Sequence, residues 1–296
     1  MTIQMDEETL AASQDGMQVS SMIELPFPAP YLWVINGDVK LKASGGAQYF
    51  GGFSTDAEKL IEAGLPYNQT EPPAGWTREE IIAANGKSID SFMSRSVIVA
   101  PIDFRKSWFW KTPGGIAQRS ADYFQGARQH VQALVYLSGK KDGAFVPWGP
   151  AVLSAKGFQA KNLLHAFEVW NKATDGQRKK VAPGVPAWFF YLAIGTFGPD
   201  RKTEMVGQGS QQSPITPISA YVPDVITPEQ VEALFVGNDI AKEMMLTKKD
   251  AAEWLKAWGT PTPRGVVPVA GAPIVAETGN ALPPEEPPFE EEEVPF

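Results

Sequence analysis

The sequence predicts a mainly β protein with some α-helix, and three observations lead to this prediction. From Ser96 onward, β-branched and aromatic residues form five runs that turn residues separate, which is typical of strands. One amphipathic helix pattern falls between the third and fourth runs. A further helical pattern follows the last run. The five runs cover residues 96–111, 130–138, 144–153, 185–197 and 215–222.

The single helix within this region is predicted over residues 161–173, where four large apolar residues recur at helical spacing. Gly176 follows the pattern and is a suitable residue to end a helix. Five strands with one helix between the third and the fourth have the order of an OB-fold, a small five-stranded Greek-key barrel. We therefore expect an OB-fold-like nucleic-acid-binding domain over residues 95–226.

The amino-terminal third precedes this domain and is acidic. Residues 1–24 are polar and patternless, so we expect a disordered leader. Residues 25–94 contain several glycine and proline turns and are expected to form an acidic extension packed on or near the barrel. One short helix is predicted from Thr77 through Ala84, because acidic residues suit its first turn.

Residues 227–258 are expected to form a helical appendage. Thr227 followed by Pro228 is a strong helix start, with the threonine as N-cap and the proline at the first helical position. Thr247 with Asp250 three residues later suggests a second, weaker start.

The last segments change to Pro, Gly, Ala and Val and then to acid. Residues 259–284 are predicted to be a flexible Pro/Gly linker, and residues 285–296 a disordered acidic tip.

Composition excludes several kinds of chemistry. The chain has no cysteine and two histidines, so thiolate zinc sites, disulfides and a cysteine nucleophile are excluded. No phosphate-binding glycine motif and no histidine pair at metal-ligand spacing occurs, so we expect no cofactor and no metal. The acidic amino terminus lacks the features of a signal peptide, and no long apolar run occurs. We therefore expect a cytoplasmic protein that does not contact membrane, in a bacterium or a phage-infected host, associated with the nucleoid.

Positive charge gathers in the middle of the chain. The whole sequence has a net charge of −8, yet residues 95–205 carry 16 Lys and Arg against 7 Asp and Glu, a net +9. Residues 265–296 carry no Lys or Arg against 7 Glu, a net −7. Because salt screens charges over roughly 10 Å, the local balance matters more than the sum. The basic region 95–205 therefore favours binding to a polyanion.

Aromatic residues alternate with cations in the same basic region, which is the combination that binds single strands by stacking and by phosphate contact. Strand alternation places Arg105, Phe109 and Lys111 on one face of the first run. Phe104, Lys106, Trp108 and Trp110 share the other face, and either face could be the exposed one. The candidate nucleic-acid-binding residues are Arg105, Lys106, Trp108, Phe109, Trp110, Lys111, Lys140, Lys141, Trp148, Phe189 and Tyr191. The alternative is that most of these aromatic residues belong to the core.

The carboxy terminus pairs acid with an apolar end, which favours a docking segment for a partner that has a pocket and basic residues. The tip consists of Glu290, Glu291, Glu292, Glu293, Val294, Pro295 and Phe296. It resembles the carboxy-terminal tip of bacterial and phage single-stranded DNA-binding proteins, which dock onto replication, recombination and repair proteins. The body is much longer than in that family and is preceded by an acidic segment of about 90 residues, so the resemblance implies a divergent member. A plain acidic tail is the alternative.

These observations favour a non-enzymatic protein that coats single-stranded DNA without strong sequence preference and recruits replication, recombination and repair proteins. RNA as ligand and a homo-oligomeric state remain open. One alternative is a nucleic-acid-processing enzyme, such as a nuclease or recombination factor, although carboxylates in the basic region are scattered. Another is an interaction or structural protein without a nucleic-acid role.

Overall fold

The structure is a computed structural model of the whole chain, and it describes residues 29–35, 51–62, 72, 74–82, 88–111, 117–123, 126–196, 204–206 and 213–257. The leader 1–24, the linker 259–284 and the tip 285–296 fall outside these residues. The described part is mainly β with some helix. None of its helices is long and apolar enough to span a bilayer.

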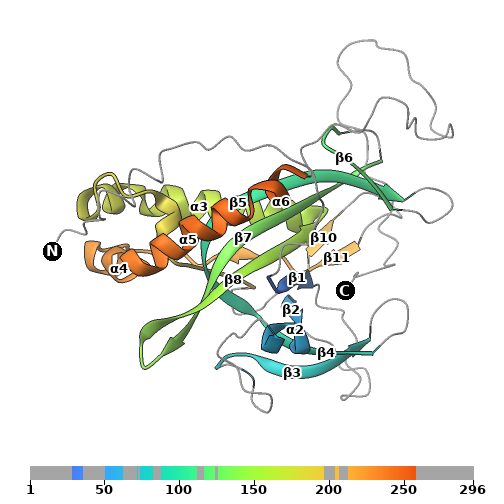
Figure 1. Cartoon of the computed structure of the whole chain (residues 1–296), viewed down its shortest axis with the longest axis horizontal. Coiled ribbons are helices and arrows are strands. Elements are labelled where there is room, and N and C mark those ends of the chain that lie inside the picture. Colours follow the sequence, from blue (N-terminus) through green and yellow to red (C-terminus); the bar gives the residue numbers. More distant parts are fainter. Residues whose placement is uncertain are drawn as a thin grey trace, which may run out of the picture.

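A single curled, mixed sheet organises the described residues and forms half a barrel (Figure 1). Nine strands follow one another in the order β12-β9-β5-β7-β8-β1-β2-β4-β3, and β6 pairs with β5. β1 is parallel to β8, whereas the other pairs are antiparallel. The strands are β1 (Tyr31–Ile35), β2 (Gly52–Asp56), β3 (Thr77–Ile82), β4 (Ser88–Ser94), β5 (Ser96–Lys111), β6 (Ala117–Ser120), β7 (Arg128–Lys141), β8 (Ala144–Lys156), β9 (Leu192–Gly195) and β12 (Ser219–Ala220). β10 (Glu204–Val206) and β11 (Ser213–Ile215) form a separate ribbon.

The five-stranded OB-fold is not confirmed, because the sheet has more strands and includes part of the amino-terminal extension. β1 to β4 continue the sheet beyond β8, across the boundary expected at residue 95. Residues 77–84 were expected to be helical, and this was wrong. β3 instead pairs with β4 from Thr77↔Met93 to Ile82↔Ser88. Tertiary pairing here overrides the weak local helix signal.

The central strands β5, β7 and β8 are long, and local residues explain their irregularities. In β5 the register shifts between Pro101 and Asp103, where proline cannot donate a ladder hydrogen bond and a bulge accommodates it. β7 and β8 form a hairpin that turns directly after Lys141. Its two turn residues, Asp142 and Gly143, both have positive φ (52° and 83°), as a tight two-residue hairpin loop requires.

Helices cover both faces of these central strands (Figure 1). On one face, named the α3 face, Phe104 of β5 packs edge-on against Phe167 of α3 (Phe158–Val181), with centroids 4.8 Å apart. The next residue, Arg105, points to the opposite face and meets Trp254 of α6 (Ala252–Ala257). This second side is named the α6 face. The predicted alternation along β5 is therefore observed at these residues.

The helix between the third and fourth runs is present but longer than expected. It begins at Phe158 and continues past Gly176 to Val181. A glycine inside a helix costs only about 1 kcal/mol. Arg178 is buried and donates hydrogen bonds to Thr174 and Asn171, which holds the last turns together.

Two predicted strands are shorter than expected. The run 185–197 begins with a 3-10 helix, η1 (Ala187–Phe189), since Pro186 enters it at φ −59°, and only β9 is extended. The run 215–222 is split by Pro217 into the end of β11 and the short β12.

The helical appendage is observed as α4 (Pro228–Ala233), α5 (Asn238–Asp250) and α6. Thr227 caps α4 as predicted. Its side chain accepts from the Gln230 backbone N–H, and the Gln230 side chain accepts from the Thr227 backbone N–H. The second predicted start was wrong, because Thr247 is buried within α5. One more helix, α2 (Ala57–Glu62), follows β2 directly.

Candidate nucleic-acid interface

Four chain segments meet at one end of the central strands. Phe109 of β5 pairs with Arg128 at the start of β7, and His130 pairs with Lys156 at the end of β8. α3 begins directly after this point. The Gly157 backbone N–H donates to the Gln129 carbonyl oxygen at 2.7 Å, which fixes the start of α3 against β7.

Cations and aromatic rings gather at this end. We name the group the strand-end cluster. It consists of Lys106, Trp108, Phe109, Tyr123, Arg128, Lys156, Phe158 and Lys161. Lys106, Tyr123 and Lys161 are exposed, and the other members are partly buried. In Figure 1 the cluster lies toward the end of β5 where β6 is labelled.

On the α6 face of the cluster, rings and cations form one packed row. The Phe109 ring meets the His130 ring edge to face, with centroids 5.9 Å apart. The Lys156 Nζ lies 5.2 Å from the Phe109 centroid, within the range of a cation–π interaction. His130 is buried, and its Nε2 lies 2.8 Å from the Ser154 Oγ. The Phe109 ring thus contacts both the buried His130 imidazole and the Lys156 ammonium group.

On the α3 face, Trp108 and Tyr123 form a second pair, with ring centroids 4.8 Å apart and planes at 70°. Lys106 projects from the same face of β5. At the start of α3, the Lys161 Nζ lies 4.9 Å from the centroid of the Phe158 ring. Each side of the strand end therefore combines aromatic surface with positive charge.

The charge at this end is nearly all positive. The segments that carry the cluster are 104–111, 117–123, 126–130 and 156–161, and Asp122 is their one carboxylate. A surface with this composition attracts phosphates, and the partly buried rings offer stacking area.

Arg105 was predicted as a contact residue, and the structure places it beneath α6 instead. Its Nε donates to the Gln132 Oε1 at 2.8 Å, and its Nη1 donates to the Trp254 carbonyl oxygen at 2.6 Å. The guanidinium carbon lies 3.6 Å from the centroid of the Trp254 ring. Arg105 therefore fastens α6 to the sheet in this structure.

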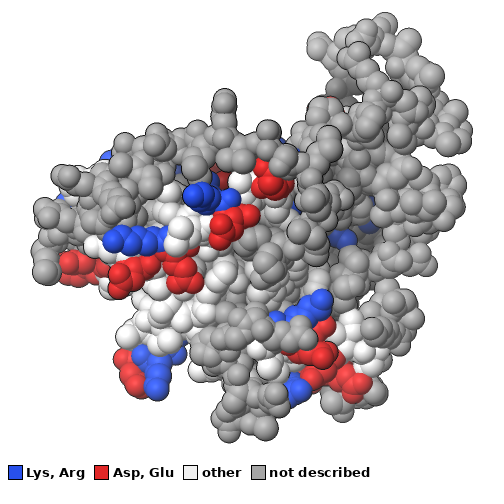
Figure 2. Space-filling model, viewed as in Figure 1, with Lys and Arg blue, Asp and Glu red and all other residues white. Residues whose placement is uncertain are grey.

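Lys140, Lys141 and Trp148 lie at the opposite end of the sheet. β7 runs from Arg128 to Lys141, so these lysines are about 40 Å from the cluster at roughly 3.3 Å per residue. Figure 2 shows Lys and Arg beside Asp and Glu at the tip of this hairpin, in the lower left. Trp148 is partly buried and packs against Trp76, with ring centroids 6.2 Å apart. The structure thus separates these predicted residues from Trp108 and Phe109.

Phe189 and Tyr191 were also predicted to contact nucleic acid, but their exposed fractions are 0% and 2%. η1 turns the chain so that Phe189 enters the core, and Tyr191 stacks on Phe145 with centroids 5.1 Å apart. Burial raises the pKa of the Tyr191 phenol to about 12. Both are core residues, as predicted by the alternative that most of these aromatic residues belong to the core.

Trp110 and Lys111, which were also predicted, lie at the end of β5. Trp110 pairs with Gln118, and Lys111 with Ala117, through the β5–β6 backbone. The tip residues 290–296 lie outside the described residues.

Five members of the cluster were not among the predicted residues: Tyr123, Arg128, Lys156, Phe158 and Lys161. A signal for three of them was present, since Lys156, Phe158 and Lys161 repeat the cation and aromatic mixture of β5. Arg128 is the first residue of the strongly apolar strand β7 and has no such signal.

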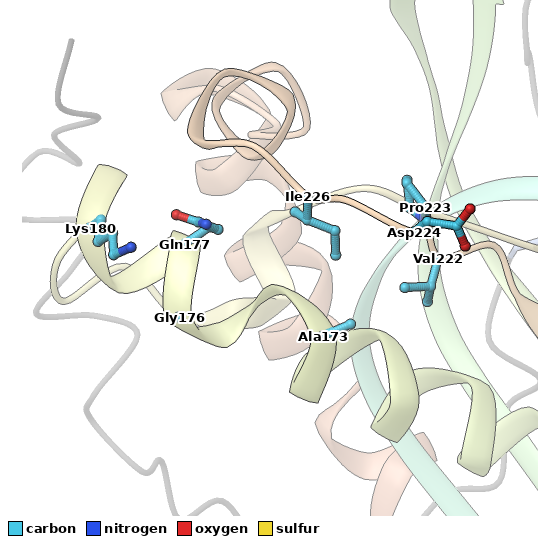
Figure 3. Close-up of a pocket in the computed structure, with 8 residues that line it drawn as sticks. All are labelled: Ala173, Gly176, Gln177, Lys180, Val222, Pro223, Asp224 and Ile226. Carbon is cyan, nitrogen blue, oxygen red and sulfur yellow. The ribbon is translucent and has the colours of Figure 1, made fainter.

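A shallow hollow of about 370 Å³ lies far from the cluster, against the last turns of α3 (Figure 3). Val222, Pro223 and Ile226 form its apolar side, and Lys180 and Asp224 lie at its rim with opposite charges. The hollow therefore has no net charge that would select a phosphate. Within the described ranges, no group of three His, Asp or Glu side chains is arranged to hold a metal ion.

Comparison of the chain with protein-family models, with curated proteins and with solved structures found no match.

Proposed function

We propose that this protein binds single-stranded DNA through the strand-end cluster and recruits other proteins through its acidic tip. The observation that carries the proposal is the gathering of four cations and four aromatic rings at one strand end, with a single carboxylate in the contributing segments. Stacking of one base on an exposed aromatic face contributes roughly 1–3 kcal/mol and is tolerant of sequence. The same cations would follow the phosphates.

The position of α6 supports a link between the two activities. α6 packs on the α6 face of the sheet, the face that also carries Phe109 and Lys156. The chain continues from Ala257 for 39 residues to Phe296. At up to about 3.5 Å per residue, this length reaches any part of the described surface. The acidic tip can therefore compete with phosphates for the cluster. A partner protein that binds the tip would remove it from the cluster.

A titration of single-stranded oligonucleotide at several salt concentrations tests the proposal. Counterion release predicts that affinity falls steeply as salt rises. In a plot of the logarithm of the binding constant against the logarithm of the salt concentration, each phosphate contact with a single strand contributes about 0.7 to the downward slope. Lys106→Gln and Lys161→Gln should each lower this slope by about that amount. Lys249→Gln, an exposed lysine of α5 outside the cluster, is the matched control and should leave the slope unchanged.

Duplex DNA and RNA of the same sequence complete the experiment. Weaker binding of duplex DNA supports a single-strand site. The comparison with RNA shows whether the protein prefers deoxyribose or ribose. Salt-independent affinity, or equal loss in the Lys249 variant, would rule out this site. Cleavage of the oligonucleotide with Mg²⁺ present would instead favour a nuclease.

A further inference from the structure

α6 covers a set of side chains that continues the strand-end cluster. Arg105 pairs with Gln132 across β5 and β7, and the next pair on the same face is Ser107 with His130, followed by Phe109 with Arg128. The surface beneath α6 and the part of the cluster on the α6 face, Phe109, Arg128 and Lys156, thus belong to one uninterrupted face. Arg105 and Gln132 are one hydrogen-bonded pair within it.

β1 extends this covered surface with two aromatic residues. Tyr31 stacks near Trp33, with ring centroids 6.2 Å apart and planes at 26°. Trp33 pairs with Ser154, and Lys156 is the next residue of β8 on the same face. Tyr31, Arg105 and Gln132 are residue types that stack on bases or bond to their edges, and they lie beside the proposed site.

Trp254 occupies the space above these residues in the manner of a base. Its ring lies over the Arg105 guanidinium at 3.6 Å, and its Nε1 donates to the Tyr31 hydroxyl at 3.3 Å. A planar nucleobase offers the same two features, an aromatic face for the guanidinium and polar edge groups for the hydroxyl.

α6 is anchored by the buried Trp254, and the partly buried Leu255 also packs against the core. It has six residues, and Trp254, 6% exposed, is its one buried side chain. Helices of this length are not stable in water without packing. The neighbouring α5 is fixed separately, since its Lys248 forms an ion pair with Asp103 at 3.0 Å. α6 can therefore leave the sheet while α5 stays in place.

We propose that the surface under α6 is a nucleobase subsite, formed by Tyr31, Arg105 and Gln132, which Trp254 occupies until a longer single strand displaces it. The proposal rests on the proposed function, because the subsite extends the strand-end cluster. A short strand would fill the cluster alone. A longer one would also bind under α6, adding one stacked base and the Arg105 cation to the interface.

Hydrogen exchange on the full chain tests displacement directly. Oligothymidylates of increasing length are added at saturation, and exchange is followed in the segment 252–257. We expect α6 amides to exchange faster only above a threshold length. α4, also six residues long, is the control and should not change. Unchanged or slower exchange in α6 with every bound oligonucleotide would overturn the proposal.

Affinity of variants gives a second, independent measurement. Trp254→Ala empties the subsite and should tighten binding of the long oligonucleotide by about fivefold or more, the equivalent of one base stack. Adding Arg105→Ala should remove this gain. Val231→Ala is a control for general destabilisation, because Val231 is buried in α4, the helix that packs against α3.

The results separate this inference from the proposed function. A folded Trp254→Ala protein with unchanged or weaker affinity would overturn the subsite, and if that variant does not fold, the exchange experiment on the natural chain still decides. Absence of salt-dependent single-strand binding in the natural protein would instead contradict the proposed function itself.

Discussion

The indole ring of Trp108 meets the phenol ring of Tyr123 edge to face, with centroids 4.8 Å apart. Tyr123 is 49% exposed, whereas Trp108 is partly buried. Such a pair is stabilised by about 0.5–1.5 kcal/mol beyond its buried area. The contact therefore holds the Trp108 ring in one orientation at the strand end, as a stacking platform requires.

Trp108→Ala and Phe109→Ala should each weaken single-strand binding by about 1–3 kcal/mol while the protein remains folded. Phe189→Ala is the matched comparison, because its ring is completely buried. It should lower the free energy of unfolding by about 3–5 kcal/mol and leave the affinity of the folded protein unchanged. Fluorescence anisotropy with a labelled oligonucleotide and urea unfolding measure the two quantities.

If Trp108→Ala and Phe109→Ala lost stability rather than affinity, both rings would belong to the core, and the strand-end cluster would lose its stacking surface. The cations alone would then account for any binding.

The sequence predicted the β class and the helix after the third run because those signals are local. The β-branched and apolar run of β7 and the Asp142-Gly143 turn are local signals for the long hairpin. The outcome at residues 77–84 shows the limit of such signals. Their strand depends on β4, which supplies the hydrogen bonds and the Asp90 carboxylate for Arg78.

The candidate site was predicted in part for the same reason. Lys106, Trp108 and Phe109 are neighbours in the sequence, so their mixture is visible there. Arg128 and Lys156 join them only through the register of β7 and β8. Arg105 is covered by Trp254, which lies 149 residues further along the chain. No local sequence pattern predicts that contact.

Two glycine substitutions should have opposite effects on stability. A Cβ on Gly139 would overlap the ring of Trp148, which packs against Trp76 and has little room to move. Gly139→Ala should therefore lower the free energy of unfolding by about 1–3 kcal/mol. A Cβ on Gly176, inside α3, meets no atom within 4 Å. Gly176→Ala should raise stability by up to about 1 kcal/mol.

Thermal and urea unfolding of the two variants check this pair of predictions. A Gly139→Ala protein as stable as the natural one would show that Trp148 repacks freely, contrary to the close packing at the hairpin base.

Stability should fall at high pH because of buried tyrosines. Burial raises the pKa of Tyr191 to about 12, whereas an unfolded tyrosine ionises near pH 10. Between these values the unfolded state binds fewer protons than the folded state, so the free energy of unfolding decreases as pH rises. Below about pH 10 both states keep the proton, and Tyr191 contributes no slope.

Tyr191→Phe keeps the ring against Phe145 and removes the ionisable group. Urea unfolding between about pH 9 and pH 12 should therefore show a shallower decline in this variant than in the natural protein. Burial and the hydrogen bond to Glu243 also hold the pKa of Tyr136 well above its usual range, so part of the decline should remain. Identical slopes in both proteins would mean that the Tyr191 phenol ionises as it does in water.

The last prediction concerns the acidic tip. Residues 265–296 carry a net charge of −7 and are tethered to a region of net +9, so the tip and the phosphates should compete for the strand-end cluster. Deleting residues 285–296 should tighten single-strand binding at low salt. The gain should fade as salt rises, because screening weakens the attraction between tip and cluster.

Deleting Phe296 alone should separate the two roles of the tip. This deletion leaves its four consecutive glutamates in place, so DNA affinity should stay close to that of the natural protein. Binding of a replication or recombination protein should be lost, since an aromatic end group that fills a pocket dominates such a contact. Pull-downs with the natural protein and the Phe296 deletion give the comparison. If both capture the same partners, the tip acts through charge alone, and the resemblance to single-stranded DNA-binding proteins loses its main support.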